Sequence, residues 1–118
     1  MELPGRISQF YAAVEERFAF LSEQGFRVAD RASYGDRFGS VRFESGGTQM
    51  YLSWDAHDGC LEAKVGDINL WPMVTAAGLW DAGRHYDVYA GFSIEGMQHG
   101  LDRIATFLTT HPGVLSDK

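Results

Sequence analysis

The chain has 118 residues, 45% of them hydrophobic and 22% charged, proportions that fit one folded domain and exclude wholesale disorder. Its 16 acidic and 10 basic side chains give a net charge of -6 without any lysine or arginine block, which disfavours generic binding to nucleic acid or to an anionic membrane. The single cysteine excludes an intramolecular disulfide, and without a signal peptide or a membrane-spanning run we expect a cytoplasmic protein.

The first predicted element is a helix between Pro4 and Gly25. Its apolar side chains recur at steps of three and four residues, the spacing that gathers them on one face of an α-helix. These residues are Ile7, Phe10, Tyr11, Val14, Phe18 and Leu21. Pro4 suits the first turn and Gly25 suits the position just after a helix C-terminus, so both ends of the helix are marked.

Four strands are predicted next, at residues 26–33, 38–45, 48–54 and 60–66. In the last three, apolar and polar side chains alternate, which places one kind on each face of a sheet. Consecutive strands of this type, joined by short turns, predict an antiparallel meander with one face buried and one polar. The polar face would carry Arg42, Glu44, Tyr51, Glu62 and Lys64.

Two further helices are predicted after the strands. Residues 67–80 suit a short helix, with Pro72 tolerated near its start. A longer helix follows the N-cap Ser93 and is stopped by Pro112. Residues 81–92 between them form a loop, or a loop with a short edge strand.

The predicted fold class is therefore α+β, in a single domain spanning residues 1–118. An N-terminal helix precedes a four-stranded antiparallel meander, and one short and one longer helix follow it. We expect the helices to pack on one face of the sheet, because one face of each predicted strand is apolar.

The segment Asp55–Cys60 (DAHDGC) gathers several groups that could bind metal or act as a nucleophile: Asp55, His57, Asp58 and Cys60. A zinc site needs ligands that converge from rigid positions, and one short turn cannot aim all of its side chains inward. The spacing does not fit a calcium loop, and no third residue is identifiable to orient a pair of Cys60 and His57. Because Asp and Gly are typical turn residues, we interpret the segment as the bend between the third and fourth strands, with His57 at an exposed tip.

A second polar group lies on the last helix, where Glu95, His99 and Asp102 are spaced by four and three residues. This spacing could hold a metal or move a proton. The group lies opposite the apolar stripe of that helix, however, and solvated groups are not tuned for acid-base work. We therefore expect ion pairing with the nearby Arg103.

The segment from Trp80 to Phe92 (WDAGRHYDVYAGF) is rich in the residue types that dominate binding hot spots. Its candidate contact residues are Arg84, His85, Tyr86 and Tyr89. Long loops in small domains are often functional, so this loop is a candidate for partner or ligand contact. The alternative that stays open is that its aromatic side chains simply cover the edge of the sheet.

Motifs of catalysis are missing from the sequence. Its glycines lack the spacing of a phosphate-binding loop, and neither a nucleophile elbow nor an HExxH motif is present. The sequence therefore predicts no catalytic residue, no cofactor and no metal, and it favours a binding protein over an enzyme.

The layout of the whole chain resembles a class of small bacterial α+β proteins, most of them uncharacterised. The matching pieces are "FAFLSEQGF", "SVRFES", "YLSWDAHDG" and "IATFLTTHPGVL", which occur in the same order within a layout that spans nearly the whole chain. Several proteins of this class look like immunity proteins of polymorphic toxin systems. The resemblance implies an inhibitory, protein-binding role, and it carries no catalytic residue over to this chain.

Two functional hypotheses from different classes follow. The first is a protein-binding module, in its most specific form an immunity-type inhibitor of a toxin or an enzyme, whose acidic charge favours a basic partner. Its candidate contact residues are Tyr51, Asp55, His57, Asp58, Arg84, His85, Tyr86 and Tyr89.

The second hypothesis is a small-molecule-binding protein or an enzyme with a pocket between sheet and helices. Trp71, Trp80, His85 and Tyr86 would lie at the mouth of that pocket. A third possibility that stays open is a homo-oligomer that pairs through the polar face or an edge of the sheet.

Overall fold

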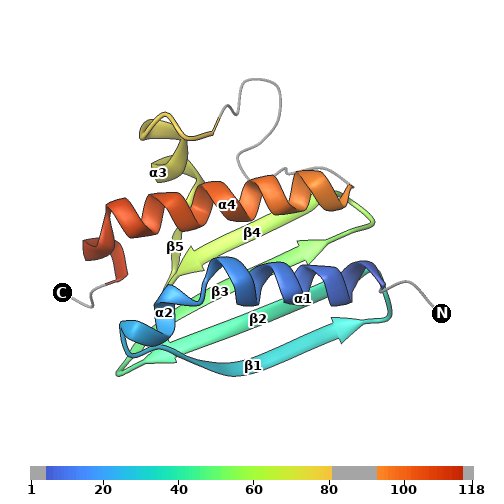
Figure 1. Ribbon diagram of the computed structural model, residues 1–118, viewed down its shortest axis with the longest axis horizontal. Helices are drawn as coiled ribbons and strands as arrows, with labels where there is room; N and C mark the ends of the chain where they lie inside the picture. The colour runs from blue at the N-terminus through green and yellow to red at the C-terminus, as the bar shows by residue number, and fades with distance from the viewer. Residues whose placement is uncertain (1–4, 81–92, 116–118) are drawn as a thin grey trace.

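The computed structural model describes residues 5–80 and 93–115 (Figure 1). Its elements are, in order, α1 (Arg6–Arg17), α2 (Phe20–Glu23), β1 (Arg27–Tyr34), β2 (Phe38–Ser45), β3 (Thr48–Asp55), β4 (Cys60–Val65), β5 (Ile68–Asn69), α3 (Trp71–Ala76), α4 (Ile94–Thr110) and the 3-10 helix η1 (Pro112–Leu115). The predicted α+β fold is confirmed, because helices at both ends of the chain pack against an antiparallel sheet. The edge strand considered for residues 85–92 lies outside the described residues.

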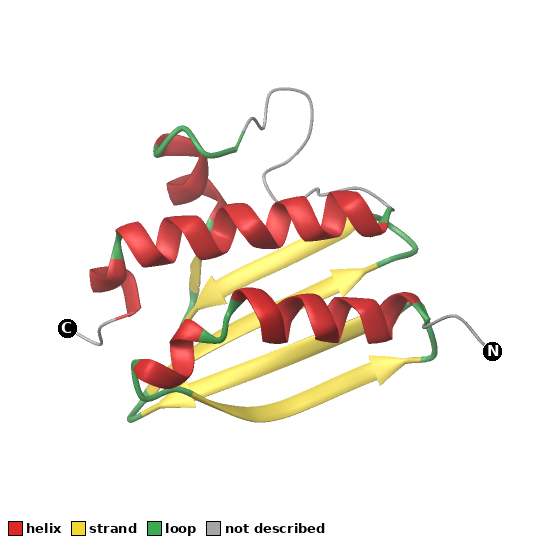
Figure 2. Cartoon of the chain, in the orientation of Figure 1, coloured by secondary structure: helices red, strands yellow, loops and turns green. Residues whose placement is uncertain are grey.

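The sheet has five strands in the order β1-β2-β3-β4-β5, each antiparallel to its neighbour (Figure 2). The fifth strand corrects the predicted four-stranded meander, since residues 68–69 fall in what was predicted as a helix. Gly66 reverses the chain with a φ of 60°, and Ile68 and Asn69 then pair with Val65 and Lys64. Only after this pairing does the chain enter the short helix α3.

The first helix is shorter than predicted. α1 ends at Arg17, and the four-residue α2 follows after a break. At the break the backbone N–H of Leu21 bonds to the carbonyl oxygen of Phe18 at 3.0 Å, and that of Ser22 bonds to Ala19 at 3.2 Å. These hydrogen bonds join residues three apart, as in a 3-10 turn, and they change the direction of the helix axis. Phe18 and Leu21 both stay buried, as the apolar stripe predicts.

α1 and α4 lie side by side on one face of the sheet, α1 over β2 and α4 over β4 (Figure 1). The core lies between these two layers and takes the apolar side of each central strand. Its largest fully buried side chains are Trp54, Trp71, Phe10, Leu21, Met50, Leu52, Leu61, Leu70, Met97, Leu101, Ile104 and Leu108. None of the described helices is long and apolar enough to cross a membrane.

Two residues determine how α1 lies on the sheet: Asp36 in the turn between β1 and β2, and Gly39 in β2. The Asp36 carboxylate accepts the backbone N–H groups of Arg6 at 3.0 Å and Ile7 at 2.9 Å, so it caps the helix from 30 residues away. Gly39 allows the helix to approach, because a Cβ at this position would lie 2.7 Å from Cγ2 of Ile7. The helix therefore packs closely on β2, but it leaves the neighbouring edge strand β1 less covered.

α4 begins as its sequence predicts. The hydroxyl oxygen of Ser93 accepts the backbone N–H of Gly96 at 2.9 Å, which makes Ser93 the N-cap. Met97, Leu101 and Ile104 of the apolar stripe of α4 are fully buried.

Candidate functional site

The second face of the sheet is not covered by any described element, because α1 and α4 both lie on the other side (Figures 1 and 2). We call this surface the open face and define it by Arg42, Glu44, Tyr51, Glu62 and Lys64, all of them half-buried except the exposed Lys64. The predicted distribution of side chains between the two faces is thus confirmed for β2, β3 and β4.

One row of the open face runs across three strands. Arg42 of β2 stands opposite Tyr51 of β3, which in turn stands opposite Lys64 of β4. Arg42 is also held along its own strand, since its Nη1 lies 3.5 Å from Oε1 of Glu44, and Arg27 of β1 binds the same carboxylate at 3.0 Å. The row therefore places a tyrosine between two cations, one of which is fixed by an ion pair.

A second row consists of small and polar residues. Ser40, Ser53 and Glu62 stand opposite one another on β2, β3 and β4. Ser53 is buried, and its hydroxyl donates to Oε1 of Glu62 at 3.2 Å. This bond fixes the position of Glu62 on the open face.

One end of the open face is formed by two turns, which we call the tip: residues 34–38 and 55–60. Phe38 stands opposite Asp55 and Asp55 stands opposite Cys60, so the register brings both turns to the same end of the sheet. The backbone N–H of Ala56 donates to the carbonyl oxygen of Arg37 at 2.7 Å and ties the two turns together.

An aromatic pair on the tip is the feature that sequence reasoning missed. The rings of Tyr34 and Phe38 lie 6.0 Å apart, and Tyr34 is 75% exposed. The sequence does predict the direction of Phe38. It lies four residues before Arg42 in the same strand, and because side chains alternate between the two faces, both point to the polar face of β2. Tyr34 could not be placed in this way, since β1 contains a bulge between Val28 and Asp30 that breaks the alternation.

The Asp55–Gly59 segment is a turn between β3 and β4, as predicted. Oδ1 of Asp55 accepts the backbone N–H groups of His57 at 2.9 Å and Asp58 at 3.1 Å, and Gly59 adopts a φ of 77°. His57 and Asp58 are exposed. The side chains of Asp55, His57, Asp58 and Cys60, which were considered as metal ligands or nucleophiles, therefore do not converge on one point.

Cys60 is the last residue of the tip and is half-buried. Burial raises the pKa of its thiol, and the nearby carboxylates of Asp58, Asp55 and Glu62 raise it further. A raised pKa leaves less thiolate at neutral pH, which makes this cysteine a weak nucleophile. Among residues 5–80 and 93–115, no three His, Cys, Asp or Glu side chains are grouped so that they could hold a metal ion.

The polar group on α4 is arranged differently from the prediction. Asp102 binds Arg17 of α1, with 2.8 Å between Nε and Oδ1, rather than Arg103 of its own helix. His99 packs its ring against Trp80, with the ring centroids 5.6 Å apart. Asp102 and His99 thus contribute to packing between elements and do not form a site.

The residues proposed for a pocket mouth are placed only in part. Trp71 is fully buried, and its indole N–H donates to the carbonyl oxygen of Leu61 at 2.7 Å, so it belongs to the core and not to a mouth. Trp80 is half-buried against Trp71, with 4.7 Å between ring centroids. The candidate residues Arg84, His85, Tyr86 and Tyr89 lie outside the described residues.

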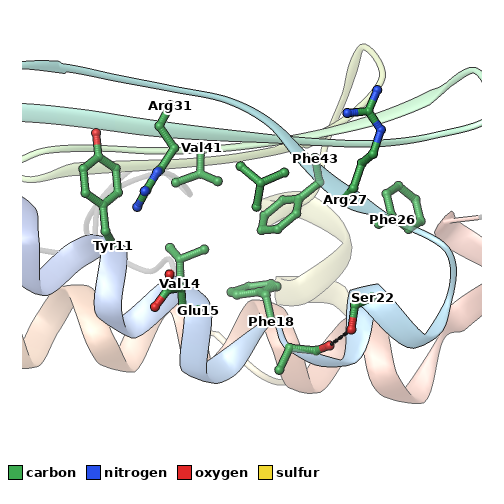
Figure 3. A pocket seen from close by; sticks show the side chains of 12 residues that line it. Tyr11, Val14, Glu15, Phe18, Ser22, Phe26, Arg27, Arg31, Val41 and Phe43 are labelled. Carbon is green, nitrogen blue, oxygen red and sulfur yellow. Dashed lines mark hydrogen bonds between the residues drawn. The ribbon is translucent and has the colours of Figure 1, made fainter.

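A groove of about 310 Å³ is found elsewhere between helix and sheet, along α1, α2 and β1 (Figure 3). Its lining consists of Tyr11, Val14, Glu15, Phe18, Ala19, Ser22, Phe26, Arg27, Val28, Arg31, Val41 and Phe43. The sequence gives only one hint of it, the irregular alternation of β1, because the groove depends on how far α1 extends over the sheet.

Comparison with known proteins yielded no match to a family model, to a curated protein or to a solved structure.

Proposed function

We propose that this protein is a protein-binding module that engages its partner through the open face and the tip. The observation that carries the proposal is the uncovered face of the sheet, on which Arg42, Tyr51 and Lys64 form a row across three strands. Tyrosine and arginine are the residues that most often dominate the free energy of binding at protein interfaces.

The rigidity of this surface supports the proposal. The backbone holds the Cβ atoms of neighbouring strands at fixed spacing, so a partner meets a surface whose backbone needs no rearrangement on binding. Arg42 is further fixed by Glu44, and Glu62 by Ser53. A surface arranged in advance loses less entropy on binding than one that has to be ordered by its partner.

The size of the surface indicates that the tip takes part. The three strands that define the open face have six to eight residues each and give a flat area of roughly 350 Å², from about 4.8 Å between strands and about 3.3 Å per residue. A stable interface buries about 800 Å² on each partner. The exposed Tyr34 and the turn that carries His57 continue the open face at one end and supply the additional area.

The charge of the surface bears on the choice of partner. Arg42 and Lys64 alternate with Glu44 and Glu62 on the open face, so a partner needs a matching pattern and not merely one sign of charge. The net charge of -6 acts at longer range and favours a basic partner through the rate of association. An immunity-type inhibitor is the most specific form of this proposal, in which binding occludes the partner's own site.

Site-specific crosslinking in the native host tests the proposal. A photoreactive phenylalanine replaces Tyr51 on the open face, and the same residue replaces the exposed Thr106 on the outer side of α4 as a matched control. We expect one protein adduct from position 51 that is absent from position 106. The partner identified from this adduct is then purified, and its affinity is measured by calorimetry for the unmodified chain and for Tyr51→Ala.

Two results would contradict the proposal. One is the absence of an adduct from position 51 at both low and high salt, and the other is the same adduct from both positions. The inhibitory form has its own test, in which the purified partner's activity is assayed with the unmodified chain and with Tyr51→Ala. Inhibition by both proteins to the same extent would reject the open face as the inhibitory surface.

A further inference from the structure

The groove between α1 and β1 lies on the helix side of the sheet, away from the open face. Its floor is apolar and is built by Val14 of α1, by Phe18 just after the end of α1, and by Val41 and Phe43 of β2 (Figure 3). Val28 of β1 completes the wall. It stands opposite the buried Phe43 and yet is 51% exposed. An apolar residue on the inner side of a sheet is normally covered, so this part of the core is open to a ligand.

Arg31 gives the groove its charge. It extends from β1 into the groove, and its guanidinium carbon lies 4.8 Å from the centre of the Tyr11 ring (Figure 3). Among the described residues it forms no ion pair, whereas Arg27 at the other end of the groove binds Glu44 at 3.0 Å. The groove thus offers a bidentate donor that no described carboxylate occupies.

Tyr11 provides the ring against which this arginine lies. Its hydroxyl donates to the carbonyl oxygen of Ala32 at 2.7 Å, which joins α1 to β1 beside Arg31. The ring is therefore held in place beside the exposed side chain of Arg31, and the guanidinium lies against it.

We propose that this groove binds a small apolar carboxylate, with its carboxylate on Arg31 and its hydrocarbon part on Val14, Phe18 and Val28. A volume of about 310 Å³ is at the lower end of the range of about 300 to 1,000 Å³ that is usual for ligand pockets. The ligand is accordingly small, an arylalkanoate or a medium-chain fatty acid of about ten non-hydrogen atoms.

The addition of a partner's strand to β1 is a less suitable use of the same region. β1 contains a bulge between Val28 and Asp30, and Arg31 points inward at the edge of the sheet. Both features are known to protect an edge strand against pairing with another chain. A small ligand needs no backbone pairing and makes use of the inward arginine.

Glu15 carries the opposite charge to Arg31 and therefore allows a test of the role of charge in the groove. It lines the groove without an ion pair among the described residues, so its charge opposes a carboxylate ligand. Replacing Arg31 and replacing Glu15 by glutamine should therefore change the affinity in opposite directions.

The experiment is a titration of the ¹⁵N-labelled chain with 3-phenylpropionate and with octanoate, followed by NMR. We expect saturable shifts of the backbone amide signals of β1 and α1 at millimolar concentrations, and none with the corresponding amides. Arg31→Gln should weaken binding about ten-fold or more, because it removes charge-assisted hydrogen bonds. Glu15→Gln should bind at least as tightly as the original chain, and Arg103→Gln, on α4 and outside the groove, should bind unchanged.

Equal shifts with acids and amides, equal affinity of Arg31→Gln, or no saturable shift in β1 and α1 would each overturn the proposal. The ¹⁵N spectra of the free variants show directly that each one is folded. The outcome is independent of the protein-binding function, because the groove and the open face lie on opposite sides of the sheet.

Discussion

Asp55 and His57 are neighbours in one turn but differ in what they contribute to it. The Asp55 carboxylate accepts two backbone N–H groups, whereas His57 is exposed and donates one of them from its backbone. The side chain of Asp55 therefore stabilises the turn, and the side chain of His57 projects from the tip towards solvent.

We expect Asp55→Ala to lower the free energy of unfolding by about 1 kcal/mol, because two backbone donors lose their acceptor and turn to water. His57→Ala is the matched control in the same turn and should leave the stability nearly unchanged. Urea denaturation of both variants measures the difference. A large loss for His57→Ala would show that its ring is packed or metal-bound, contrary to its exposure.

α1 shows at the scale of the element that a helix can depend on a distant residue. Its N-cap residue is Gly5, which has no side chain to accept the first backbone N–H groups. Asp36 supplies the acceptor, and a Cβ on Gly5 would lie 2.7 Å from its Oδ1, so the glycine leaves room for the carboxylate. These hydrogen bonds from Ile7 and Arg6 hold the pKa of the Asp36 carboxyl below its ordinary value of 3.8.

A lowered pKa in the folded state has a defined consequence for stability. Such a group stabilises the fold at pH values above its unfolded pKa, and the contribution disappears as the pH falls through the folded pKa. We expect Asp36→Asn to lower the melting temperature at pH 7. The difference from the original chain should shrink as the pH falls below 3.8. A difference that persists unchanged in acid would mean that the carboxylate charge is not involved.

The control for this measurement is Asp67→Asn. Asp67 is exposed in the turn between β4 and β5, away from the helix ends. Its replacement should leave the melting temperature at pH 7 nearly unchanged.

At the scale of the whole molecule, the two layers leave different surfaces free. α1 and α4 cover one face of the sheet and no described element covers the open face, while β1 extends beyond α1 at one edge (Figure 1). The inward Arg31 and the bulge lie at this edge, where strands of two copies could otherwise pair. The edge strand β1 is therefore protected against pairing with another chain, although it is long.

We expect the chain to sediment as a monomer of 13.1 kDa at micromolar concentration. Arg31→Val should shift it towards dimers or larger species, because an apolar, β-branched residue then replaces the inward charge on the edge strand. Analytical ultracentrifugation of both proteins gives the masses. A dimer of the original chain would instead favour a second copy as the partner of the sheet.

Several features were fixed by short stretches of sequence. β2 spans residues 38–45 in both prediction and structure, and its two faces follow the alternation, because the direction of a side chain in a strand depends only on its position. The Ser93 cap and the turn at Asp55 were equally predictable, since each is formed by hydrogen bonds within three residues.

Other features depend on segments that are distant in the chain. The cap of α1 by Asp36 joins residues 30 apart, and the ion pair of Arg17 with Asp102 joins residues 85 apart. The groove exists because α1 packs on Gly39 of β2 and leaves Val28 uncovered, which no local pattern encodes. The sequence by itself thus determined β2, β3, β4 and α4 with their polar and apolar sides, but it did not determine the strand β5 or the break between α1 and α2. Only the tertiary structure decided which residues meet at the tip and in the groove, because those contacts depend on how the layers pack.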